Sequence, residues 1–256
     1  MKTSNEIFNE IYEEAKLDEN IIGFFLGGSR GKGRENPYSD YDTYIIVKDE
    51  VVNEYKEKYP FEKYEGLDLI VLTLTELKKC GDWYTGERFE RYTFAHIKAL
   101  LDKKSEIQKI LEKKARIPEK ELHDYIAKSI DAYINFFYRS LKCLRDGDLP
   151  AARLEAAYSI PYFLNTIFAI HRGRLNPYYK YLRWELEEFP LTKFPMQPNE
   201  IIETLMNMLE TADLKIQQNL MRITEEMCRE EGYGFQFDDW GEKYQWMINF
   251  KLEDKD

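Results

Sequence analysis

Apolar and polar residues follow two different patterns along the chain, and the pattern changes near residue 116. Before that point, short apolar runs alternate with polar stretches, which is typical of buried strands separated by turns and helices. The runs that predict strands are residues 21–26, about 42–47, 67–74 and 94–101. Strands interleaved with helical stretches predict a small mixed α/β sheet with flanking helices.

The polar stretches between these runs have the spacing of amphipathic helices. The first opens with Thr3-x-x-Glu6, the pattern of a capping box, and continues with apolar residues three and four apart. The charged stretch 49–59 has the same spacing and predicts a second helix. The remaining expected helices are a short one beginning at Thr75 and one over residues 106–114.

Strand patterns disappear after residue 116, and apolar residues recur at helical spacing over long stretches. We therefore predict two domains, an α/β domain over residues 1–116 and an all-α helical bundle over residues 117–256. The expected helices are residues 122–144, 150–171, 178–188, 200–210 with Asn199 as N-cap, and a last one ending at residue 230. The second is apolar on nearly all sides, which is typical of the centre of a bundle. The aromatic tail beyond it is expected to pack back onto the bundle.

Composition limits what such a protein binds. The chain has 256 residues, of which 43% are hydrophobic and 33% charged, as in ordinary globular proteins. Its net charge is −10, and residues 117–256 hold the larger excess of acidic residues. Phosphate contacts dominate the affinity for nucleic acids, so a chain without a basic patch is not expected to bind tRNA or poly(A). An acidic surface instead suits a cationic small molecule.

Cysteine spacing and hydropathy give no sign of export or of membrane insertion. Cys80, Cys143 and Cys228 are scattered and odd in number, so they predict neither a disulfide framework nor a metal site. The first residues do not have the pattern of a signal peptide, and no apolar run approaches the ~20 residues of a membrane span. We expect a cytoplasmic protein without membrane contacts.

The candidate chemistry lies between the first and second apolar runs. The first run ends at Gly27-Gly28-Ser29, where glycines let the backbone approach a ligand and the hydroxyl can bind phosphate oxygens. Asp40 and Asp42 stand two residues apart at the start of the next strand, so their side chains point to one face. Neighbouring carboxylates repel each other unless a cation lies between them, and carboxylate oxygens suit Mg²⁺. The stretch predicts a phosphate site beside a divalent-metal site, which suits the handling of nucleoside triphosphates.

A GGS turn followed after ten residues by D-x-D resembles the signature of the nucleotidyltransferase superfamily (DNA polymerase β-like). It is similar in particular to the small bacterial aminoglycoside and lincosamide nucleotidyltransferases, which inactivate antibiotics. The motifs cover roughly the first 110 residues. This superfamily needs a third carboxylate on a neighbouring strand, and Asp68, a single acid inside the apolar run 67–74, matches it.

The resemblance implies an enzyme of the EC 2.7.7 type, in which a substrate hydroxyl attacks the α-phosphorus of a nucleoside triphosphate and pyrophosphate leaves. Asp40 and Asp42 would hold one Mg²⁺ on the phosphates, and a second Mg²⁺ about 3.5–4 Å away would activate the hydroxyl. Asp68 would ligate the second ion, act as the general base, or do both. A structural role for Asp68, as a loop cap or as the partner of a buried arginine, stays open.

Four residues after the first strand are assigned to the nucleotide by the resemblance: Gly27, Gly28, Ser29 and Arg30. Gly28 and Ser29 would hold the β- and γ-phosphates. The later basic residues of the loop, Lys32 and Arg34, are expected to be solvated.

Two residues of the helical part are weaker candidates. Lys180 resembles a lysine that reaches the triphosphate in related enzymes, against the alternative of a solvated surface lysine. Glu155 is the alternative general base, since some antibiotic-modifying relatives use a glutamate of the helical domain. A structural ion pair, with Arg153 beside it, is the preferred interpretation of Glu155.

These observations favour a Mg²⁺-dependent enzyme that transfers a nucleoside monophosphate, AMP from ATP, to a hydroxyl of a small molecule. An antibiotic of the aminoglycoside or lincosamide type is one acceptor, and a housekeeping metabolite is another. The alternatives are an AMP-transferring antitoxin-type enzyme that modifies a protein and a non-catalytic nucleotide sensor. The acceptor, the nucleotide and the oligomeric state, a homodimer included, stay open.

Overall fold

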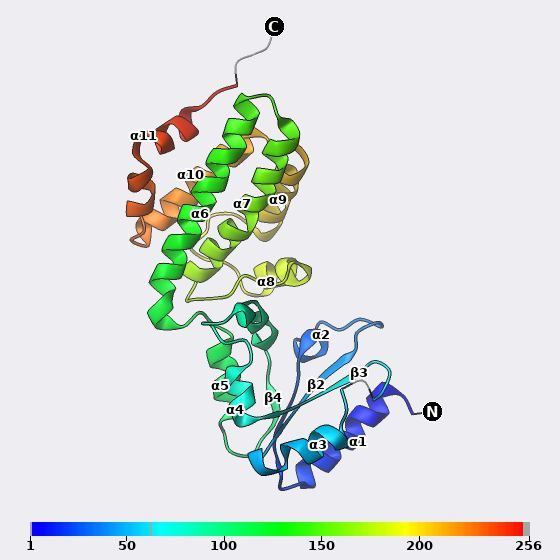
Figure 1. Ribbon diagram of the computed structural model, residues 1–256. Helices are drawn as coiled ribbons and strands as arrows, with labels where there is room; N and C mark the ends of the chain where they lie inside the picture. Colours follow the sequence, from blue (N-terminus) through cyan, green and yellow to red (C-terminus); the bar gives the residue numbers. More distant parts are fainter. Residues whose placement is uncertain (1, 62, 253–256) are drawn as a thin grey trace. The chain divides into compact units, whose positions relative to one another are not determined.

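The computed structural model describes residues 2–61 and 63–252, which form two compact units, Met1–Arg116 and Ile117–Asp256 (Figure 1). The first unit contains a four-stranded sheet with the strand order β3-β2-β1-β4. Its strands are β1 (Ile21–Leu26), β2 (Tyr41–Val47), β3 (Leu67–Thr73) and β4 (Ala99–Asp102). The first three coincide with predicted runs to within one residue, so these strand predictions are confirmed.

Helices cover both faces of this sheet. They are α1 (Ser4–Leu17), α2 (Gly28–Gly31), the 3-10 turn η1 (Asp49–Val51), α3 (Val52–Lys58), α4 (Leu74–Lys79), the 3-10 helix η2 (Gly86–Phe94) and α5 (Ile107–Lys114). α1 begins at the predicted capping box of Thr3 and Glu6. Successive strand residues point to opposite faces, so Phe24 packs with α1 and α3 while Phe25 packs with α4 and α5. Figure 1 shows the two pairs of helices on either side of the strands.

The sheet is mixed, and its pairing brings distant acidic residues together. β1 is antiparallel to β2 and to β4, whereas β2 and β3 are parallel. A parallel pair needs a crossover connection, and α3 lies on it. In the parallel register Asp42 lies directly opposite Asp68.

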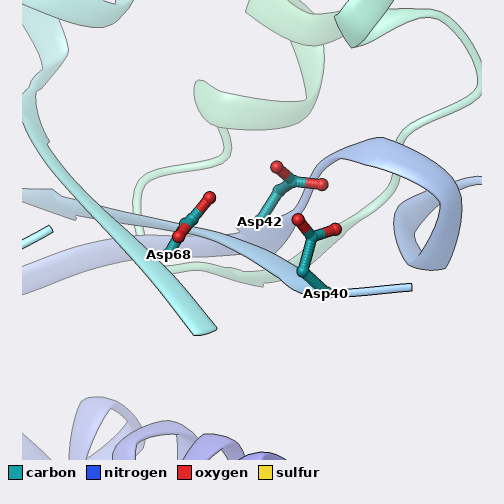
Figure 2. A group of neighbouring side chains, drawn as sticks. All are labelled: Asp40, Asp42 and Asp68. Carbon is teal, nitrogen blue, oxygen red and sulfur yellow. The ribbon is translucent and has the colours of Figure 1, made fainter. Parts of the chain in front are cut away.

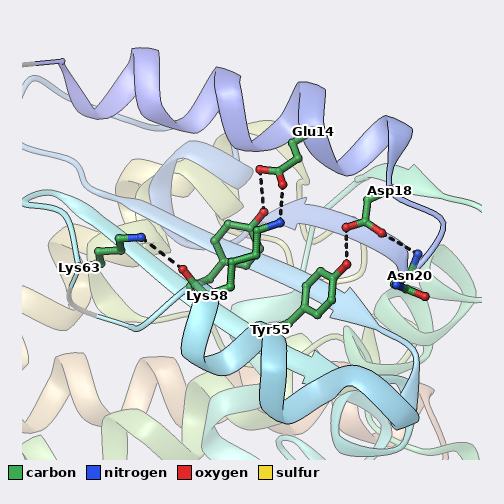
Figure 3. Close-up of polar contacts among 7 residues, drawn as sticks. Glu14, Asp18, Asn20, Tyr55, Lys58 and Lys63 are labelled. Carbon is green, nitrogen blue, oxygen red and sulfur yellow. Dashed lines mark hydrogen bonds and ion pairs between the residues drawn. The ribbon is translucent and has the colours of Figure 1, made fainter.

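Polar contacts join α1 to α3 on one face of the sheet (Figure 3). The hydroxyl of Tyr55 donates to the carboxylate of Asp18, and the ammonium of Lys58 pairs with Glu14. Burial opposes ionisation of Asp18. Its pKa nevertheless lies below the ordinary value, because the Tyr55 hydroxyl and the backbone N–H of Asn20 both donate to the carboxylate. These contacts hold the crossover helix against α1.

The fourth strand lies later in the chain than predicted. The apolar run 94–101 is not a strand throughout, because η2 ends at Phe94 and β4 begins at Ala99. Between them His96 has a φ of 63°, which lies outside the β region and interrupts a regular strand. Phe94 and Ile97 are buried in the sheet's core, so core packing rather than strand pairing explains the apolar run.

The second unit is helical, as predicted. Its helices are α6 (Glu119–Arg145), α7 (Leu149–Ile170), the 3-10 turn η3 (Tyr179–Tyr181), α8 (Leu182–Glu188), α9 (Pro198–Thr211), α10 (Leu214–Glu230) and α11 (Phe235–Asn249). α6 and α7 form the main packed pair of this unit (Figure 1). Over the described ranges, no helix combines the length and apolar character that a bilayer crossing requires.

Three details of the helical unit differ from the predictions. α7 is not buried on all sides, since Leu154 and Tyr158 on its outer face are 66% and 63% exposed. Gln197 rather than Asn199 caps α9, because Pro198 fits the first helical position, where no backbone N–H is needed. The aromatic tail packs inward as expected but forms a helix of its own, α11, interrupted at Gly241.

Candidate active site

Three carboxylates converge at one edge of the sheet (Figure 2). Asp40, Asp42 and Asp68 each offer an oxygen, and these three oxygens lie within 4.8 Å of one another. Asp42 and Asp68 stand opposite each other near the starts of parallel strands, and Asp40 lies two residues before Asp42, so its side chain returns to the same face. The structure thus brings together the three acidic residues singled out in the sequence.

The chemistry of this cluster fits a divalent cation. Like charges at this separation destabilise one another in the absence of a counter-charge. Asp40 is exposed and the other two are half-buried, so the oxygens are reachable from outside the sheet. A small, all-oxygen, anionic donor set is the one that Mg²⁺ prefers, and such ions keep open positions for phosphate oxygens. The three side chains could therefore hold Mg²⁺.

The glycine turn before the cluster lies against Asp42, and at Gly28 this contact leaves no room for a side chain. The N–H of Gly27 donates to the carbonyl of Asp42 at 2.8 Å, which ties the end of β1 to β2. Gly28 has a φ of 53°, and a Cβ built on it would lie 1.8 Å from Oδ2 of Asp42. A side chain at this position would push the carboxylate aside. The backbone turn and the Asp42 carboxylate are therefore in direct contact.

Ser29 follows in α2, a single helical turn that begins at Gly28. It is half-buried, and its carbonyl accepts from the N–H of Arg34 at 2.8 Å, which closes the loop behind the turn. Gly27, Gly28 and Ser29 thus form one short segment beside Asp42. Successive backbone N–H groups and a hydroxyl in such a segment can bind phosphate oxygens.

Arg30, predicted at the nucleotide, makes its observed contacts with the loop that carries Asp40. Its Nε donates to the carbonyls of Asp40 and Ser39 at 3.0 and 3.2 Å, and its Nη2 donates to Ser39 at 2.8 Å. Its guanidinium carbon lies 3.9 Å from the centroid of the Tyr41 ring. The guanidinium therefore lies between the loop backbone and an aromatic ring.

The prediction that Lys32 is solvated is wrong. Lys32 is only 7% exposed, and its ammonium donates to the carbonyls of Tyr92 and Thr93 at 3.0 and 3.2 Å and to that of Ala95. A buried ammonium is tolerated when carbonyl oxygens replace its water, as they do here. Arg34, by contrast, is exposed as expected.

The two helical candidates belong to the second unit. Lys180 is exposed in η3, with its ammonium 4.8 Å from the Tyr181 ring centroid. Glu155 forms an ion pair as expected, but its partner is Arg139 on α6, at 2.5 Å, rather than Arg153. The Nε of Arg153 donates instead to the carbonyl of Leu209.

Two residues that support the cluster escaped the sequence analysis. The N–H of Tyr41 donates to the carbonyl of Gly66 at 3.0 Å, which starts the pairing of β2 with β3 and sets Asp42 against Asp68. Tyr41 also provides the ring beneath Arg30. A glycine directly before an apolar run was a signal for Gly66, whereas Tyr41, between two aspartates, resembles any strand residue.

The comparison with protein families agrees with this geometry. Residues 5–130 match the family described as nucleotidyltransferase domain. A solved structure, a nucleotidyltransferase-like protein from Exiguobacterium sibiricum 255-15, is similar at 12% sequence identity and a TM-score of 0.44, with 91% of this chain and 78% of that chain covered. No curated protein matches the chain.

Proposed function

The chain belongs to the nucleotidyltransferase superfamily and is a nucleotidyltransferase, and from this premise we propose that it is a Mg²⁺-dependent enzyme that transfers AMP from ATP to a hydroxyl of a small molecule. The observation that supports this best is the convergence of Asp40, Asp42 and Asp68 within 4.8 Å, directly against the Gly27-Gly28 turn. A phosphate cradle in contact with a metal ligand suits the reacting end of a nucleoside triphosphate.

The proposed roles follow from position. Asp40, Asp42 and Asp68 would hold Mg²⁺, which neutralises charge on the triphosphate when bound. Gly28 and Ser29 would bind the β- and γ-phosphates through backbone N–H groups and the hydroxyl. The protein thus acts mainly by positioning its two substrates and by balancing charge.

The transfer is an in-line displacement at phosphorus. The acceptor oxygen forms a bond to the α-phosphorus, while the bond from that phosphorus to the α,β-bridging oxygen breaks and pyrophosphate leaves with the electron pair. The hydroxyl proton passes to a general base. We assign this role to Asp68, which lies in the acidic cluster opposite Asp42, rather than to Glu155, whose Oε1 pairs with Arg139 outside that cluster.

The charge of the chain guides the proposal for the acceptor. A net charge of −10 favours a cationic, hydroxylated small molecule over a nucleic acid, and an antibiotic of the aminoglycoside or lincosamide type meets that description. Because the three cysteines of the chain are free and scattered, we place the enzyme in the cytoplasm. Modification of a protein, or nucleotide sensing without turnover, are the outcomes that would replace this assignment.

The first experiment is a pyrophosphate-release assay with ATP and Mg²⁺ across aminoglycosides, lincosamides and simple sugars. Acceptor-dependent release that EDTA abolishes would support the proposal. ATP binding without release for any small acceptor, together with tight salt-sensitive binding of tRNA or oligo(A), would contradict it.

A matched pair of variants then tests the assignment of the base. Asp68→Asn should lower turnover by at least ~10²-fold with little change in melting temperature, because it removes a proton acceptor and ligand rather than a core side chain. Glu155→Gln should leave turnover within a few-fold of wild type. The reverse result would move the base to the helical unit, and a large loss of stability in Asp68→Asn would make that residue structural.

A further inference from the structure

Asp40 differs from the other two carboxylates in what holds its backbone. Asp42 and Asp68 lie within paired strands, so the β2–β3 ladder fixes both of them. Asp40 precedes the first residue of β2 and is exposed. Its place in the cluster therefore depends on contacts made outside the ladder.

Arg30 supplies these contacts. Its Nε lies 3.0 Å from the carbonyl oxygen of Asp40 and 3.2 Å from that of Ser39, and its Nη2 lies 2.8 Å from the Ser39 oxygen. A guanidinium offers donors in a rigid, planar fork, so it can hold two successive carbonyls in one orientation. Fixing the Ser39 and Asp40 peptides fixes the direction in which the Asp40 side chain leaves the backbone.

The ring of Tyr41 in turn holds the guanidinium of Arg30 in place. It stacks on the ring of Tyr41 at 3.9 Å, and Tyr41 is only 8% exposed. The hydroxyl of Tyr41 donates to Asn5 at 2.9 Å, and its ring lies 5.1 Å from that of Phe8, so α1 anchors the platform. A chain of contacts thus runs from α1 through Tyr41 and Arg30 to the backbone of Asp40.

We propose that Arg30 is a positioning residue of the metal site, which sets the Asp40 carboxylate against Asp42 and Asp68 by holding the Ser39–Asp40 backbone. This inference rests on the proposed function, since it assumes that the three carboxylates bind a divalent cation. It differs from the sequence-based role of Arg30, in which its positive charge contacts the triphosphate. A lysine at position 30 would preserve the positive charge that the triphosphate role requires, but not the guanidinium fork that the positioning role requires.

The test measures Mn²⁺ binding to the nucleotide-free protein by calorimetry or water-proton relaxation. Arg30→Lys keeps the charge but loses the fork, so we expect Mn²⁺ affinity to fall about 10- to 100-fold, the usual effect of losing a residue that orients a metal ligand. At saturating Mn²⁺, the KM for ATP should remain that of the wild type. Tyr41→Leu, which removes the platform, should weaken Mn²⁺ binding in the same direction, whereas Tyr41→Phe, which keeps the ring, should not.

Other results of these measurements would contradict either the inference about Arg30 alone or the proposed function as well. Wild-type Mn²⁺ affinity in both Arg30→Lys and Tyr41→Leu, with a raised KM for ATP in Arg30→Gln, would overturn the inference and assign Arg30 to the triphosphate. In that case Asp42→Asn would still abolish Mn²⁺ binding, and the proposed function would stand. Mn²⁺ binding that survives Asp42→Asn in the otherwise wild-type protein would overturn both.

Discussion

The two units of this protein treat their acidic side chains in opposite ways. In the sheet unit, Asp40, Asp42 and Asp68 are gathered within 4.8 Å at one edge. In the helical unit, buried acids stand singly beside a base, as Glu185 does, 2% exposed and 2.7 Å from Arg174.

This difference distinguishes acidic residues with a structural role from acidic residues with a functional role. An acid that lies beside its own base does not leave an uncompensated charge in the fold. Three acids gathered this closely repel one another, and a bound cation would relieve that repulsion. Clustered acidic side chains are therefore a better guide to the functional site than acidic side chains that are only buried.

The largest effect is expected at Gly28, where the turn contacts the cluster. Gly28→Ala would place a methyl group 1.8 Å from Oδ2 of Asp42, so the carboxylate must move. A displacement of about 1 Å at a reacting centre can cost ~10²-fold in rate, and we expect at least that loss of turnover and a parallel loss of Mn²⁺ affinity.

Gly33→Ala is the matched control for this prediction. Gly33 has a similarly positive φ of 65° in the same loop, but a Cβ there would meet nothing within 4 Å. Both variants pay the left-handed backbone cost of about 1–2 kcal/mol in stability, and only Gly28→Ala disturbs Asp42. Equal losses of turnover in Gly28→Ala and Gly33→Ala would show that backbone strain, and not contact with Asp42, explains the glycine at position 28.

The same contrast explains how far the sequence could predict the molecule. Short apolar runs predicted β1, β2 and β3, because a strand buried on both faces leaves little choice of residue. Asp68 was visible for the same reason, as a single acid in an apolar run. The glycine turn and the paired aspartates were recognisable because their spacing matches the signature of the nucleotidyltransferase superfamily.

The failures at Lys32 and Glu155 share a physical cause, since each depends on contacts between segments far apart in the sequence. Nothing near Lys32 in the sequence indicates that the carbonyls of residues 92–95 will surround its ammonium. β4 was misplaced because an apolar run reports burial, and the backbone of His96 breaks the run. Arg139 as the partner of Glu155 required the packing of α6 against α7.

A smaller effect is expected at Lys180, the residue through which the helical unit would contribute a charge to the reaction. Lys180 is exposed, and as a triphosphate ligand it would stabilise the departing pyrophosphate. Loss of one charge-assisted contact costs about 1.5–3 kcal/mol, so Lys180→Ala should weaken ATP utilisation roughly ten- to a hundredfold in kcat/KM without unfolding the protein. Lys215→Ala, at another exposed lysine of this unit, is the control. Identical kinetics for the two variants would leave Lys180 a solvated surface residue and confine the charge chemistry to the sheet unit.

The smallest effect concerns a buried group that the helical unit keeps neutral rather than paired. His171 is 7% exposed; its Nδ1 lies 2.5 Å from the carbonyl of Ile167, and its Nε2 accepts from the N–H of Lys193 at 2.9 Å. Nδ1–H donates and Nε2 accepts only in the neutral ring. Burial lowers the pKa of His171, opposed by the Ile167 carbonyl and reinforced by nearby Arg174.

The sign of the resulting pH dependence follows from this shift. Below the ordinary value of 6.5, the unfolded chain protonates this histidine before the folded one does, so the free energy of unfolding falls as pH falls. The slope from this group is at most about 1.4 kcal/mol per pH unit. His171→Gln should flatten the dependence of the urea-unfolding free energy on pH between pH 7 and pH 5, and His123→Gln, at an exposed histidine on α6, is the matched control. An unaltered slope in His171→Gln would mean that the ring accepts a proton in place, and that the helical unit compensates charge here as it does at Glu185.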